Sequence, residues 1–150
     1  MRIVVGSDHA GVVLKISIRE HLCKLDGITV VDVGADSETP AADYPDITVE
    51  ACRALQQGQV DRGILVCGSG IGMCIAANKC RGIRACVCHD VYSAAQGVEH
   101  DGMNVLALGA RVIGPALARS VVEVFVNARF SNEQRHRRRL EKVTRLEDVG

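Results

Sequence analysis

Aromatic side chains and surplus charge are both scarce in this sequence. Its 150 residues include no tryptophan, two tyrosines and two phenylalanines, and 18 Lys and Arg balance 18 Asp and Glu. Proteins that bind single-stranded nucleic acid stack the bases on aromatic rings. A basic surplus is typical of proteins that bind nucleic acid or anionic membranes. We therefore expect neither a nucleic-acid partner nor a membrane partner.

Long hydrophobic segments are lacking as well. The most apolar stretch, residues 63–80, is interrupted by glycines and is shorter than the ~20 residues that span a bilayer. The sequence enters a strand-like segment directly after Met1, so we expect no secretory signal. A hydrophobic fraction of 47% in a chain of this length predicts a single domain over residues 1–150 with its own core.

Cysteine, in contrast, is abundant, with seven residues. The odd count, and the apolar strand and helix positions of several of them, favour reduced thiols in a cytoplasmic protein over a disulfide scaffold. Cys86 and Cys88 are separated by one residue and lack the C-x-x-C spacing of zinc sites. We therefore expect no metal.

Strand-like and helix-like segments alternate along the whole chain. The segments that read as strands are 2–6, 28–33, 63–67, 84–88 and 104–108, and those that read as helices are 11–25, 43–57, 71–79, 91–98 and 115–126. This alternation predicts an α/β fold of three αβα layers, a Rossmann-like five-stranded parallel sheet with helices on both faces. The loops that follow the strands should meet at one edge of the sheet, where such folds bind ligands.

The most informative of these loops follows the strand that ends at Cys67. Gly68, Gly70 and Gly72 indicate a tight turn into a helix, so backbone amides lie beside the thiol and favour an anion. A dinucleotide fingerprint would need glycine where Met73 stands, and the Gly-Lys-Ser/Thr of a P-loop is absent. The turn therefore suits a small anion or an oxyanion. Thiols near helix amino termini serve as bases or as nucleophiles, and the residues alone leave both roles open for Cys67.

The tail predicts one more helix, over about residues 131–148, with Ser131 or Asn132 as its cap. Arg135 and Arg139 are four residues apart on one face of that helix and suit a phosphate. Leu140, Val143 and Leu146 form a narrow apolar stripe.

Several motifs in this order resemble those of a known family. They are Gly-Ser-Asp-His-Ala-Gly at 6–11, Asp-Tyr-Pro at 43–45, Cys-Gly-Ser-Gly-Ile-Gly at 67–72, Ile-Ala-Ala-Asn-Lys at 75–79, His100 with Asn-Val-Leu at 104–106, and Arg135-His136 with Arg139. The chain resembles the type B ribose-5-phosphate isomerases, whose family also includes galactose-6-phosphate and allose-6-phosphate isomerases.

The resemblance implies an aldose–ketose isomerase that acts on ribose 5-phosphate through a cis-enediolate, without metal or other cofactor. In the branch that uses a thiol, Cys67 would move the proton between C2 and C1, and His100 would open the furanose ring. The enediolate oxygens would be held by Ser69 and by the amides of Gly68, Gly70, Ile71 and Gly72. Asp8 and Tyr44 would bind sugar hydroxyls, and the phosphate would be surrounded by His9, Arg135, His136 and Arg139, with Arg111 as a further candidate.

The resemblance also implies a homodimer or a dimer of dimers, in which the last helix packs on the partner subunit and the sites lie at the subunit boundary. One position departs from the family pattern: Asp101 stands where an asparagine is usual after the ring-opening histidine. Two alternatives stay open, an isomerase of a six-carbon sugar phosphate and a non-catalytic protein that binds sugar phosphates.

Overall fold

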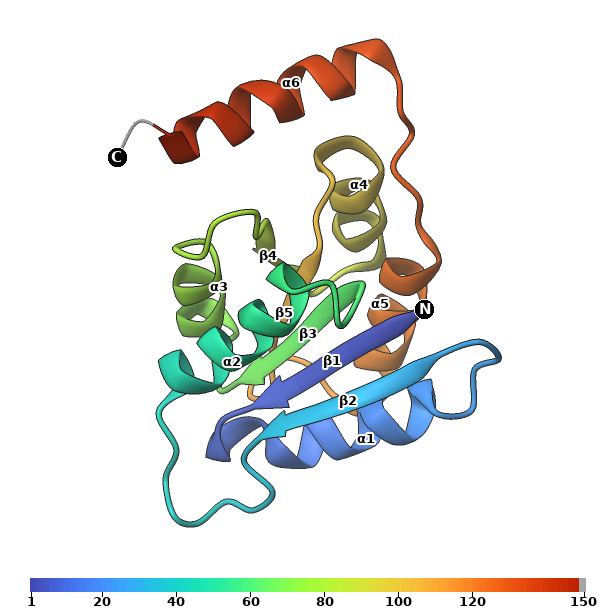
Figure 1. The fold of residues 1–150 in the computed structure, drawn as a ribbon. Coiled ribbons are helices and arrows are strands. Elements are labelled where there is room, and N and C mark those ends of the chain that lie inside the picture. Colours follow the sequence, from blue (N-terminus) through green and yellow to red (C-terminus); the bar gives the residue numbers. More distant parts are fainter. Residues whose placement is uncertain (149–150) are drawn as a thin grey trace.

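Five short segments rich in branched hydrophobic residues pair into one parallel sheet, and helices connect them (Figure 1). The computed structural model describes residues 1–148 of the chain. The strands are β1 (Arg2–Ser7), β2 (Thr29–Gly34), β3 (Arg62–Cys67), β4 (Ala85–Val87) and β5 (Val105–Gly109). The helices are α1 (Val12–Leu22), α2 (Tyr44–Gln56), α3 (Ile71–Ala77), α4 (Val91–Asp101), α5 (Pro115–Asn127) and α6 (Gln134–Arg145), with short 3-10 turns η1 (His9–Gly11) and η2 (Leu146–Asp148).

The strand order is β2-β1-β3-β5-β4, and every neighbouring pair is parallel. The predicted five-stranded parallel sheet with an extra C-terminal helix is therefore confirmed. Because all strands run the same way, their carboxyl ends share one edge of the sheet. The loops after β1, β2, β3 and β5 lie along that edge.

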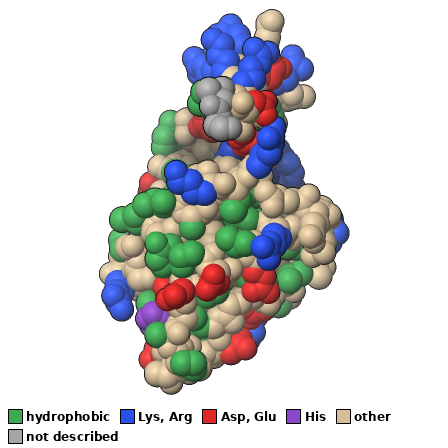
Figure 2. Space-filling view, turned by 60° about the vertical axis from the view of Figure 1, so that its left-hand side comes forward, with side chains coloured by type: hydrophobic (Ala, Val, Ile, Leu, Met, Phe, Trp, Pro, Cys, Tyr) green, Lys and Arg blue, Asp and Glu red, His purple; other side chains and the backbone are tan. Residues whose placement is uncertain are grey.

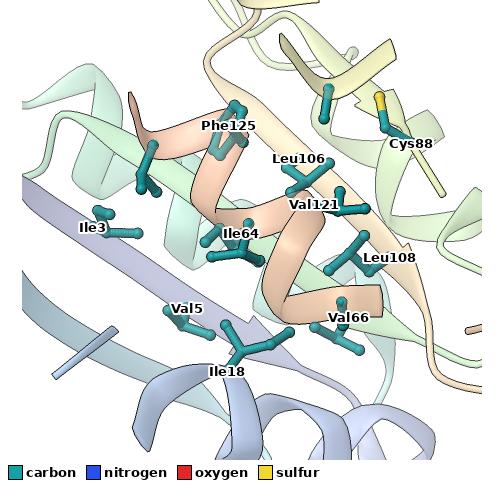
Figure 3. Close-up of a cluster of buried hydrophobic side chains, with 14 of the residues drawn as sticks. Ile3, Val5, Ile18, Ile64, Val66, Cys88, Leu106, Leu108, Val121 and Phe125 are labelled. Atoms are coloured by element: carbon teal, nitrogen blue, oxygen red, sulfur yellow. The ribbon is translucent and has the colours of Figure 1, made fainter. Parts of the chain in front are cut away.

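Two hydrophobic clusters separate the sheet from the helices on its two faces. Alternate side chains of β1 and β3 point to opposite faces, so Ile64 and Val66 pack with α1, α4 and α5, whereas Leu65 and Cys67 pack with α2 and α3. Figure 3 shows the larger cluster, in which Phe125 and Val121 of α5 lie against Ile64 and Leu106 of the sheet. These are the three predicted layers.

The last helix begins later than the sequence predicted. The expected caps Ser131 and Asn132 lie before it, and α6 starts at Gln134, after Glu133, with no side-chain cap. The Ser131 hydroxyl is instead 2.7 Å from Nδ1 of His136. The same hydroxyl accepts the N–H of Glu133 at 3.4 Å, so its contacts lie before the first residue of the helix.

Helix α6 extends along one end of the molecule and carries most of its residues exposed to solvent (Figure 1). Figure 2 shows its Lys and Arg side chains gathered on a projecting part of the surface. The turn η2 attaches the end of the helix to the loop after α3. Arg81 of that loop pairs with Asp148, and the Gly82 N–H donates to Glu147 Oε1 at 3.0 Å. Within residues 1–148, no helix is both long enough and apolar enough to cross a membrane.

Candidate functional site

Cys67 is the last residue of β3 and lies at the carboxyl edge of the sheet, where only 5% of its surface is exposed. The N–H of Gly70 donates to its sulfur at 3.1 Å. The sulfur is therefore held at the carboxyl end of β3 with a backbone N–H directed at it.

The turn after Cys67 depends on glycine at two positions. Gly70 has a φ of 80°, and a Cβ there would come 3.0 Å from the backbone of Leu108. At Gly72 a Cβ would lie 2.9 Å from the ring of Tyr44. The glycines thus allow the turn to approach β5 and allow the Tyr44 ring to lie over the start of α3.

A hollow of about 400 Å³ opens beside the thiol. Its walls come from three segments that follow strands, and from the start of α2. The lining residues are Asp8, His9, Ala10, Tyr44, Cys67, Gly68, Ser69, Gly72, Arg111 and Val112. The hollow thus brings together eight of the residues predicted to form the site, while Gly70 and Ile71 lie in the same turn.

Asp8 and His9 are held by the backbone around them. Asp8 is buried, and its Oδ1 accepts hydrogen bonds from the N–H groups of Ala10 and Gly11 at 2.9 and 3.1 Å. His9 Nδ1 lies 3.3 Å from both the nitrogen and the carbonyl oxygen of Ala42. These contacts fix both side chains at the rim and give Asp8 a structural role beside any role in binding.

Arg111 supplies a cation within the same hollow. Its guanidinium packs over Gly68, where an added Cβ would lie 3.4 Å from Nη1. Ser69 lies between them and the helix, and its hydroxyl accepts the N–H of Ile71 at 3.3 Å. The hollow therefore combines a thiol, hydroxyl and amide donors, and a positive charge, a set that suits an anionic hydroxylated molecule.

The remaining predicted residues form a second cluster around the end of α4 and the start of α6. The rings of His100 and His136 stack with their centres 4.1 Å apart. Only 2% of the His136 surface is exposed, and burial, then the charges of His100 and Arg135, lower the pKa of His136. His136 therefore packs against His100 and does not present its ring on the exposed face of α6.

Asp101 and Arg139 lie beside this pair. Together with Arg84 they line a hollow of about 240 Å³ between α6 and the body. Arg135 is exposed and pairs with Glu133 at 2.9 Å. The second cluster thus gathers His100, Asp101 and two arginines of α6 on one side of the molecule.

The two clusters lie at opposite ends of the strands: the first at their carboxyl ends, the second near their amino ends. In the pairing of β3 with β5, Cys67 is opposite Gly109, whereas Val105, just after the second cluster, is opposite Gly63. Four residue steps along a strand correspond to roughly 13 Å. Within one chain, the structure therefore does not bring Cys67 together with His100, Asp101, Arg135, His136 or Arg139.

Residues 1–148 contain no group of three or more His, Cys, Asp or Glu side chains placed to hold a metal ion. Cys86 is exposed and Cys88 is buried. The reactive side chains of the two clusters are a thiol, imidazoles, carboxylates and guanidinium groups.

Comparisons with known proteins agree with this arrangement. The model of the Ribose/Galactose Isomerase family matches residues 3–143. The chain belongs to this family. Ribose-5-phosphate isomerase B of Escherichia coli is 42% identical over 97% of this chain and 96% of its own length. D-erythrulose-4-phosphate isomerase of Pectobacterium atrosepticum is 44% identical over 87% of this chain and 85% of its own.

The crystal structure of ribose-5-phosphate isomerase B from Mycoplasma genitalium with bound ribulose-5-phosphate superposes with a TM-score of 0.92. It is 36% identical and covers 99% of this chain and 97% of that one. The resemblance to type B ribose-5-phosphate isomerases read from the motifs is thus confirmed at the level of the family.

Two further residues lie in these clusters and were not predicted from the sequence. Val112 lines the hollow beside Cys67, and Gln96 places its side-chain nitrogen 3.1 Å from Nδ1 of His100. Val112 carries no polar group that would mark it. Gln96 is one helical turn before His100, so the i, i+4 spacing was the one available signal.

Proposed function

We propose that this protein is a sugar-phosphate isomerase that interconverts ribose 5-phosphate and ribulose 5-phosphate. The observation that carries the proposal is the Cys67 thiol beside amide donors in a hollow that also holds Asp8, Tyr44 and Arg111. Membership of the Ribose/Galactose Isomerase family supports it. So do the names of the E. coli and M. genitalium relatives and the ribulose-5-phosphate bound in the latter.

In the proposed reaction the Cys67 thiolate takes the proton from C2 of the open-chain aldose. The electron pair of that C–H bond forms the C1–C2 double bond, and the carbonyl π electrons move to O1, giving a cis-enediolate. Ser69 and the amides of the glycine turn donate to this oxygen. O1 then gains a proton, O2 loses one and becomes the ketone, and the Cys67 thiol returns its proton to C1. No step calls for a metal, so we expect a chelator to leave the rate unchanged.

Ring opening is assigned to His100, because an imidazole exchanges protons near neutral pH. The phosphate is assigned to His9 and Arg111 from one cluster, and to Arg135 and Arg139 from the other. His136 supports His100 from its buried position. Asp101 is assigned to the sugar, at the position where the related family has an asparagine.

These assignments need two copies of the chain, because the clusters lie at opposite edges of the same sheet. A sugar phosphate held against Cys67 is too short to reach His100 of the same chain. A symmetric dimer solves this by placing the second cluster of one subunit over the hollow of the other, and it forms two equal sites.

The surface around each cluster fits such an interface. Beside the Cys67 hollow, Ile71 and Ile75 of α3 are 56% and 58% exposed, and Val112 is 56% exposed. On α6, Val143 is 50% exposed, and Leu140 lines the hollows beside it. Apolar faces of this kind are typical of surfaces that a partner covers. We propose a homodimer, or a pair of such dimers, working in the cytoplasm, where its thiols stay reduced.

The preferred sugar is tested by measuring turnover, with and without a chelator, on ribose 5-phosphate, D-erythrulose 4-phosphate, allose 6-phosphate and galactose 6-phosphate. The four-carbon substrate is included because of the P. atrosepticum relative. We expect the highest kcat/KM on ribose 5-phosphate. A non-catalytic binding protein would raise its melting temperature with a sugar phosphate and convert none of the four, and that result would refute the proposal.

A further inference from the structure

Cys52 and Cys80 are two thiols that the proposed reaction does not use. Cys52 lies in the middle of α2, and Cys80 lies in the turn that follows α3. The remaining thiols have separate surroundings: Cys23 is exposed at the end of α1, and Cys74, Cys86 and Cys88 lie near one another around β4.

The packing of α2 places Cys52 against Cys80. Gln56 is one helical turn after Cys52, and its side-chain nitrogen donates to the carbonyl of Arg81 at 2.8 Å. The face of α2 that carries both residues is therefore pressed on the turn that contains Cys80. Cys52 belongs to the buried cluster between α2, α3 and the sheet, and Cys80 packs on the edge of that cluster.

The two thiols differ in their access to solvent. Cys80 is half-buried and lines a surface hollow with Lys79 and Arg81, whereas only 1% of Cys52 is exposed. Burial, together with the neighbouring Cys80 thiol, raises the pKa of Cys52 to about 12. A small oxidant therefore meets Cys80 first, and Cys52 lies behind it in the buried cluster on which Cys80 packs.

We propose that Cys52 and Cys80 are an oxidative modification site, which a peroxide converts into a disulfide between α2 and the end of α3. The Cys80 thiolate attacks hydrogen peroxide, forms an S–O bond as the O–O bond breaks, and with one proton gives a sulfenic acid and water. The Cys52 sulfur then attacks the Cys80 sulfur. The S–O bond breaks, and the departing hydroxide takes the Cys52 proton and leaves as water. The two thiols are oxidised by two electrons, and one peroxide is reduced to two waters.

The cross-link joins elements that already touch, so it needs no rearrangement of the sheet. It closes the chain segment from residue 52 to residue 80, which includes β3, the glycine turn and α3. A disulfide stabilises a fold by restricting its unfolded chain, and more so for a longer loop. The oxidised protein should therefore unfold at a higher temperature while its sheet stays unchanged.

The experiment treats the full-length, reduced protein with hydrogen peroxide, blocks the remaining thiols and maps peptides without reducing agent. We expect a peptide in which Cys52 is linked to Cys80, and a melting temperature raised by roughly 5–10 °C that dithiothreitol reverses. Cys80→Ser, a change near the surface, should remove both effects. Cys23→Ser is the matched control and should retain both.

Three results would overturn the proposal. One is a fully oxidised sample without the Cys52–Cys80 peptide. Another is a linked peptide that joins Cys74 or Cys86 to Cys88 instead. The third is a Cys80→Ser protein whose melting temperature rises on oxidation as much as that of the unchanged chain. If Cys52→Ala does not fold, the Cys80→Ser comparison still decides, because none of these measurements depends on isomerase activity.

Discussion

At the residue scale, the central contact of the site is the hydrogen bond from the N–H of Gly70 to the Cys67 sulfur at 3.1 Å. In the proposed reaction this thiol acts as a base. A nucleophile that forms a covalent bond with the substrate would use the same thiol. The distinction lies in what happens to hydrogen at C2 of the substrate.

We expect Cys67→Ala to lower kcat by about 10²–10⁴-fold, as for the loss of a positioned base, and to leave KM nearly unchanged. Cys67→Ser should behave alike, because a hydroxyl is a far weaker base than a thiolate. The measurement is the exchange of the C2 hydrogen with deuterated water, followed by NMR. Cys88→Ser, which alters a buried thiol away from the hollow, is the matched control. A Cys67→Ala protein that exchanges at a near-native rate would rule out this base.

Asp101 carries a negative charge into the hollow that it shares with Arg84 and Arg139. An asparagine there could donate a hydrogen bond to a sugar oxygen, whereas an ionised aspartate can only accept one. We expect Asp101→Asn to raise kcat on ribose 5-phosphate, by up to about 10², the usual effect of one oxyanion donor. Asp101→Glu, which retains the charge, should give no gain. An unchanged or lower kcat for Asp101→Asn across pH 6–9 would show that the site uses the aspartate as it stands.

His136 links the second cluster to pH. Because burial lowers its pKa in the folded protein, the unfolded chain, with a pKa near 6.5, takes up a proton first as the pH falls. The contribution of neutral His136 to stability is therefore present above about pH 6.5 and is lost as the pH falls below that value. Urea unfolding at pH 7.5 and 5.5 should show a drop in midpoint that is smaller in His136→Gln. Equal drops in both proteins would contradict this role.

At the scale of elements, the sequence was sufficient for the strands and most helices, since their hydrophobic pattern is local. It also placed Asp8, Tyr44, Cys67 and Ser69 at one sheet edge, because parallel strands bring their following loops together. The predicted start of α6 was wrong, since the helix begins at Gln134 and the Ser131 hydroxyl contacts the His136 ring and the N–H of Glu133 before it. His100 lies near the end of α4, and a helix that leads into a parallel strand ends at the amino end of that strand, so the separation of His100 from Cys67 follows from the same alternation of elements.

Helix α6 has little of its own domain to cover, and it carries Arg135 and Arg139, two of the three arginines proposed for the phosphate. We expect truncation after Phe130 to weaken self-association and to raise KM, because the apolar side of α6 and its cations are lost together. Analytical ultracentrifugation and steady-state kinetics measure the two effects. Since removal of the helix also exposes His100, Arg139→Gln serves as the milder variant and should raise KM while the oligomer persists. A truncated chain that is monomeric and fully active would refute the assignment.

At the scale of the whole molecule, the fold separates the chemistry into two halves at opposite edges of one sheet. The thiol, the glycine turn and one cation belong to the carboxyl edge, and the imidazole pair and the arginines of α6 belong to the other. A single chain would then hold an incomplete site at each edge. Two chains related by a two-fold axis would hold two complete sites, each built from both subunits.

The most direct test is to co-express two inactive chains, one with Cys67→Ala and one with His100→Asn, under different affinity tags. In a mixed dimer, one site receives both changes and the other receives neither. With random pairing, the total activity should return to about a quarter of the wild-type value, all of it in the doubly tagged fraction. The doubly tagged fraction alone should show about half of the wild-type activity per dimer. Doubly tagged dimers as inactive as each parent, alongside an active wild type purified in the same way, would show that each site lies within one chain.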